Sequence, residues 1–69
     1  MELTLAQQVG AKLKALREKK ELNVVDAAKG VGVGFRSLYD WESCTRSPST
    51  RNLEKLAAFY GTTAAKLLK

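Results

Sequence analysis

Residues 23–42, which read NVVDAAKGVGVGFRSLYDWE, contain the features that decide the fold. Asn23 is a residue that favours the N-cap of a helix, because its side-chain oxygen can accept a backbone N–H of the first turn. We therefore expect a short helix over 24–31. Ala27 and Ala28 lie on its inward face, and such small side chains let a second helix cross closely.

A tight turn and a second helix follow. Gly32 interrupts the apolar pattern, and glycine adopts the positive φ that such a turn requires. The next helix is expected over 34–43, with Leu38 as the wedge between the two helices and Trp41 in the core. This pair would present its second helix as a ridge, and a ridge of that size fits a major groove about 12 Å wide.

Three further helices complete the expected all-α fold, a compact five-helix bundle that occupies residues 1–69 as one domain. Apolar residues recur at helical spacing in each of them. The first is expected over 5–20, and its inward residues are Leu5, Val9, Leu13 and Leu16. The second is expected over 50–60, between the cap Ser49 and the stop Gly61, and its inward residues are Leu53, Leu56, Ala57 and Tyr60. The third is expected over 64–69, after a Thr62 or Thr63 cap, and its inward residues are Leu67 and Leu68.

Composition excludes several classes of protein. A chain of 69 residues supports one small core and leaves little room for an enzyme cleft. No His and a single cysteine, Cys44, exclude a zinc finger, an internal disulfide and a nucleophile–base pair, so we expect no enzyme activity, metal, cofactor or small-molecule substrate. No apolar run approaches the roughly 20 residues of a membrane span, and no secretory signal is visible, so we expect a cytoplasmic protein that does not bind membranes.

The charge balance favours an anionic partner. Twelve Lys and Arg residues against seven Asp and Glu residues give a net charge of +5. Such an excess attracts phosphates in a salt-dependent way without selecting a base sequence.

Five short motifs occur in order along the chain: LREKK (16–20), AAKGVGV (27–33), LYDWE (38–42), RSPS (46–49) and LEKLAAFYGTT (53–63). With these motifs the chain resembles the Cro/repressor-type helix-turn-helix domains of lambdoid phages and bacterial regulators. The resemblance implies a lambda repressor-like fold and sequence-specific binding of double-stranded DNA by a transcriptional regulator. Repression is the expected role of this regulator.

The resemblance also implies which residues read bases. The recognition helix of the family corresponds to 34–43 here, and its early outward positions are Gly34, Phe35 and Arg36, with Asp40 one turn later. Arg36 suits guanine O6 and N7, Phe35 a thymine methyl, and Asp40 a cytosine amine. The alternatives are a solvated surface arginine for Arg36 and a peripheral core aromatic for Phe35.

Phosphate contacts are expected at the start of the second helix and in the loop after the third. The residues at those places are Asn23, Val24, Ser43, Thr45, Arg46 and Arg51. The family often pairs an arginine of the first helix with the glutamate that ends the recognition helix, which implies a structural ion pair between Arg17 and Glu42. We assign Lys12, Lys14 and Lys19 to the solvated surface of the first helix.

A lone domain of this size is expected to bind as a symmetric dimer on two half-sites about one helical turn apart. Family members often pair through the last helix, so Phe59 and Leu68 are dimer candidates. Phe59 lies off the apolar stripe of its helix, which indicates partial exposure. Its alternative assignment is a satellite core contact.

Four positions depart from the family pattern. Val24 replaces a polar residue, Gly34 replaces a Ser or Thr cap, Cys44 replaces a glycine, and Asp40 adds a negative charge to the reading face. Val24, Gly34 and Asp40 motivate an alternative function, a protein-interaction or antitoxin-like module that keeps the fold with weak DNA reading.

Overall fold

The computed structural model describes residues 5–68, and their secondary structure is five α-helices without a strand. The helices are α1 (Leu5–Lys19), α2 (Val24–Val31), α3 (Phe35–Glu42), α4 (Thr50–Tyr60) and α5 (Ala64–Leu67). The all-α fold class expected from the sequence is confirmed. Within it, α1 ends at Lys19, α3 runs from Phe35 to Glu42, and α5 ends at Leu67, so the expected ranges 5–20, 34–43 and 64–69 were each slightly too long.

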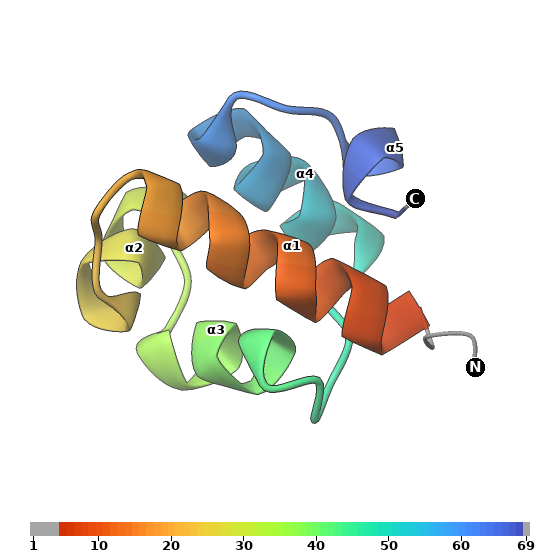
Figure 1. The fold of residues 1–69 in the computed structure, drawn as a ribbon, viewed down its shortest axis with the longest axis horizontal. Coiled ribbons are helices and arrows are strands. Elements are labelled where there is room, and N and C mark those ends of the chain that lie inside the picture. Colours follow the sequence, from red (N-terminus) through yellow and green to blue (C-terminus); the bar gives the residue numbers. More distant parts are fainter. Residues whose placement is uncertain (1–4, 69) are drawn as a thin grey trace.

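The other four helices are arranged around α1, which crosses the middle of the molecule (Figure 1). In this view α4 and α5 lie above α1, α3 lies below it, and α2 closes one end. α1 packs on α3 and α5, α2 packs on α3 and α4, and α4 packs on α5. The helix–turn–helix pair α2–α3 is therefore held from both sides by the other helices.

One hydrophobic core receives a side chain from each helix. The buried residues are Val9, Leu13, Ala27, Ala28, Val31, Leu38, Trp41, Leu53, Leu56, Ala57, Tyr60 and Leu67. All of them have the apolar spacing that predicted the helices. The inward placement of Leu68 was wrong, because its side chain is 39% exposed, and the expected side-chain position of Leu5 lies outside the described residues.

Short side-chain caps start three of the helices. Asn23, Ser49 and Thr63 each accept a backbone N–H three residues later, from Asp26, Asn52 and Lys66. Gly32 and Gly61 end α2 and α4 with φ of 91° and 69°, which only glycine adopts without strain. These local signals explain why the boundaries of α2 and α4 match the sequence.

The approach of α1 to the end of α3 depends on Gly10. A Cβ at this position would lie 2.5 Å from the backbone oxygen of Trp41 and 2.9 Å from Sγ of Cys44. Contacts that short require the backbone of α3 to move. A residue without a side chain therefore sets the distance between these helices.

Candidate nucleic-acid interface

The turn between α2 and α3 is built around Ala28. Its carbonyl accepts the N–H of Gly32 at 2.9 Å and that of Val33 at 3.0 Å, which ends α2 and reverses the chain. Leu38 then enters the core with no exposed surface, against the Ala27–Ala28 face of α2. This packing leaves the opposite face of α3 in solvent as a ridge.

The outer face of α3 carries the residues expected to read bases. Gly34 is the N-cap of α3 and makes no side-chain cap bond. Phe35 and Arg36 are exposed on the first turn, and Asp40 is half-buried one turn later. Tyr39 is as exposed as Phe35, at 58%, although the sequence interpretation did not include it among the reading residues.

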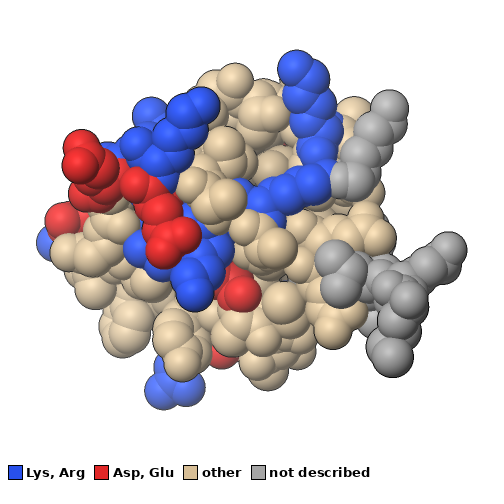
Figure 2. Space-filling model, in the orientation of Figure 1, with Lys and Arg blue, Asp and Glu red and all other residues tan. Residues whose placement is uncertain are grey.

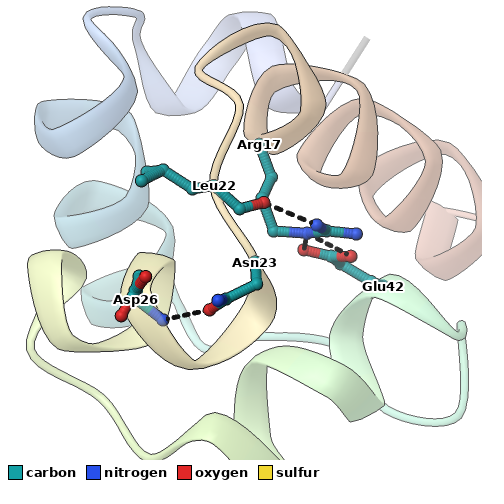
Figure 3. A network of polar contacts seen from close by, with 5 residues as sticks. All are labelled: Arg17, Leu22, Asn23, Asp26 and Glu42. Carbon is teal, nitrogen blue, oxygen red and sulfur yellow. Dashed lines mark hydrogen bonds and ion pairs between the residues drawn. The ribbon is translucent and has the colours of Figure 1, made fainter.

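Arg17 holds the end of α3 against the scaffold. Its Nε donates to Oε2 and Oε1 of Glu42 at 2.8 and 3.0 Å, and its Nη1 donates to the carbonyl of Leu22 at 2.8 Å (Figure 3). The hydrogen bond to Glu42 is the main cause that raises the pKa of Arg17, and burial opposes it. One guanidinium therefore joins α1, the segment that enters α2, and the last residue of α3.

A hollow of about 220 Å³ lies beside the start of α2. It is lined by Lys14, Arg17, Val24, Tyr39, Glu42 and Ser43. The structure thus brings Val24 and Ser43, two of the residues expected near phosphates, into one site. Because Arg17 and Glu42 pair with each other, the ammonium of Lys14 leaves the lining with a net positive charge.

Lys14 is a candidate that the sequence interpretation placed on the solvated surface of α1. Its position three residues before Arg17 was a usable signal, since residues three apart share one face of a helix. The face that carries the expected ion pair is also the face that meets α2 and α3. A lysine on it therefore lies near the candidate interface.

The segment after α3 is folded back on Asp40. The backbone N–H groups of Thr45 and Arg46 donate to the Asp40 carbonyl at 3.0 and 3.3 Å, and Ser43 Oγ donates to it at 3.3 Å. Ser43, Thr45 and Arg46 remain exposed. Arg51, on the first turn of α4, is also exposed but does not line the hollow that contains Ser43.

The two dimer candidates differ in their surroundings. Phe59 is half-buried, its ring lies edge-on to Tyr60 at 5.0 Å, and Nζ of Lys20 lies 5.5 Å from its centre. A Cβ on Gly30 would lie 2.3 Å from the ring, so α2 packs directly on it. Leu68 instead is exposed and lines an apolar hollow of about 250 Å³ with Val9, Ser47, Pro48, Thr50 and Leu53.

Charge is distributed unevenly over the visible face of the molecule. Figure 2 shows acidic and basic groups together at its upper left, whereas the lower edge, formed by α3, is mostly uncharged.

Within residues 5–68, no helix has the length and hydropathy to cross a bilayer. The same residues contain no cluster of three His, Cys, Asp or Glu side chains suited to a metal ion.

Comparison with known proteins agrees with this geometry. Residues 13–67 match the family model described as Helix-turn-helix. Over 58 residues the chain is 40% identical to the "Cryptic phage CTXphi transcriptional repressor RstR" of Vibrio cholerae, an alignment that covers 84% of this chain and 52% of that protein. The chain spans about half the length of this relative. The match over residues 13–67, the five-helix fold and the geometry of the α2–α3 turn together show that this chain belongs to the helix-turn-helix family.

Proposed function

We propose that this domain binds double-stranded DNA with sequence specificity and that it belongs to a transcriptional repressor. The observation that carries the proposal is the exposed outer face of α3, which Arg17 and Glu42 hold in a defined orientation. Similarity to a phage transcriptional repressor supports the regulatory role. We place this activity in the cytoplasm, where a bacterial or phage operator is found.

In this proposal α3 enters the major groove with its first turn leading. Arg36 donates to O6 and N7 of a guanine, and Phe35 packs on a thymine methyl. Asp40 accepts from a cytosine amine. Gly34 lets the backbone of the helix start approach the base edges, since no other part of the described chain lies within 4 Å of the position of its missing Cβ.

Backbone phosphates lie along both sides of α3 in the proposed complex. One phosphate sits at the hollow beside Val24, where Lys14 and the α2 N-terminus attract it. The remaining phosphate contacts come from exposed polar and basic groups at the start of α2, after α3 and on α4, namely Asn23, Ser43, Thr45, Arg46 and Arg51. These contacts position α3 without selecting a sequence.

The domain binds as a symmetric dimer in this proposal, with the second copy meeting it near α5. Exposed Leu68 and the apolar hollow beside it support this surface. Phe59 contributes less, because its ring is already packed by α2 and Lys20. The two recognition helices then read half-sites about one helical turn apart.

Selection from random double-stranded DNA at low and at higher salt tests the function. We expect an enriched palindromic motif whose binding weakens steeply with salt. Arg36→Ala should lose about 1–3 kcal/mol of discrimination at one base pair, whereas Lys55→Ala, which removes an exposed charge from α4, should retain the motif. Weak, salt-labile binding without a motif would contradict the proposal and favour the protein-interaction module.

A further inference from the structure

Two exposed aromatic side chains form a ridge on α3. Phe35 and Tyr39 are each 58% exposed, more than any other large hydrophobic residue that the structure describes. Residues four apart on a helix are neighbours on one face, so Phe35 and Tyr39 project from the same side of α3 on successive turns. The adjacent face of the same helix carries Arg36 and Asp40.

The core does not account for this ridge. Neither ring belongs to the buried cluster or to the half-buried hydrophobic residues that pack against it. The chain has only two Phe, two Tyr and one Trp, so a large share of its aromatic surface lies unburied on eight residues. Leaving apolar area in water forgoes the stabilisation that burial supplies, which points to burial in a complex.

The charges beside the ridge identify the chemistry of its partner. Tyr39 lines the hollow that contains Lys14, and Arg36 lies next to Phe35 on the first turn of α3. These two basic groups favour a polyanion. Within the major groove of DNA the apolar feature is the C5-methyl group of thymine, which protrudes from the base edge.

We propose that Phe35 and Tyr39 act together as a reader of two thymine methyl groups in each operator half-site. This inference rests on the proposed DNA-binding function and adds Tyr39 as a specificity-determining residue. Four residues of α-helix rise about 6 Å, and successive bases of one strand rise about 3.4 Å. A helix lying along the groove therefore places the two methyl groups about two base-pair steps apart.

Deoxyuridine tests the proposal without altering the protein, because it pairs as thymine does but lacks the methyl group. Each thymine of the selected operator is replaced in turn, and the Kd is measured by fluorescence anisotropy at one fixed salt concentration. We expect two positions in each half-site, about two steps apart, at which the replacement weakens binding roughly 3- to 5-fold. The other thymines should tolerate it.

Protein variants assign each methyl group to a ring. Phe35→Ala should remove the sensitivity to deoxyuridine at one position, and Tyr39→Ala should remove it at the other. Tyr39→Phe is the matched control, because it keeps the ring and deletes only the hydroxyl, so its deoxyuridine profile should equal that of the original protein. Both alanine variants replace exposed side chains and should melt within a few degrees of it.

The outcomes separate this inference from the function on which it rests. A retained motif with equal affinity for thymine and deoxyuridine operators would overturn the methyl reader and leave DNA binding in place. Loss of the sensitivity to deoxyuridine in Tyr39→Phe would also overturn the methyl reader, since the hydroxyl rather than the ring would then make the contact. Absence of any enriched motif would overturn the proposed function itself.

Discussion

Nε of Arg17 lies 2.8 Å from Oε2 of Glu42, and the two side chains are only 14% and 7% exposed. The pair connects the last turn of α1 to the last residue of α3. Because Arg17 also binds the Leu22 carbonyl, the orientation of α3 is coupled to the segment that starts α2. The orientation of the outer face of α3 therefore depends on a contact made on its opposite side.

Arg17→Ala should destabilise the domain by about 2–4 kcal/mol, because it leaves the shielded carboxylate of Glu42 without its partner. The melting temperature should fall by roughly 8 °C or more, as expected for a domain of this size. Chemical denaturation measures the change, and exposed Lys19→Ala is the control that removes a charge from the same helix. Additive effects of Arg17→Ala and Glu42→Ala would contradict a direct coupling between the two side chains.

Tyr60 should make stability sensitive to alkaline pH. Burial raises the pKa of its hydroxyl to about 12; the charge of Glu42 adds to this effect and Arg17 opposes it. In the unfolded chain the Tyr60 hydroxyl ionises near pH 10. Its contribution to the free energy of unfolding is therefore complete below pH 10 and is lost as the pH rises from 10 to 12.

Tyr60→Phe tests this dependence. The hydroxyl is buried and has no hydrogen-bond partner among residues 5–68, so its removal should leave stability at pH 7 unchanged or slightly higher. Urea denaturation from pH 7 to 11 should show a shallower alkaline decline than in the original protein. Tyr39→Phe, at an exposed tyrosine, is the control for other groups that titrate in this range. If the free energy of unfolding falls with pH equally steeply in both variants, the alkaline dependence does not come from Tyr60.

Cys44→Gly should stabilise the domain by about 1 kcal/mol. Cys44 has a φ of 65°, a left-handed conformation that is strained for a residue with a Cβ. Cys44→Ala keeps the Cβ and is the matched control, so it should not show the gain. A melting temperature of Cys44→Gly at or below that of Cys44→Ala would mean that the thiol packing against α1 outweighs the strain.

Gly34→Ser should supply the cap that α3 lacks. Gly34 has extended backbone dihedrals, and no atom of the described residues lies within 4 Å of its absent Cβ, so a serine hydroxyl can accept an N–H of the first turn. The expected gain is a few tenths of a kcal/mol in the free energy of unfolding. Hydrogen exchange should also slow at the first turn of α3, whereas Gly34→Ala, without an acceptor, should leave the exchange there unprotected.

Local residues were enough to predict most of the fold. Asn23 and Ser49 cap helices through atoms three residues away, and Gly32 and Gly61 end them through their own φ. The error at Leu68 has the opposite origin, since its exposure depends on how α5 lies against α1 and α4. Periodicity marks an apolar face but does not specify how far a neighbouring helix covers it.

The sequence by itself determined the helices, their caps and the apolar stripe of each, because these properties act within one or two turns of the chain. Tertiary structure decided which distant side chains meet. It placed Lys14 with Val24 and Ser43 around one hollow and packed Phe59 against Gly30. Such contacts depend on the crossing distances of packed helices, and those distances are set by all the core side chains together.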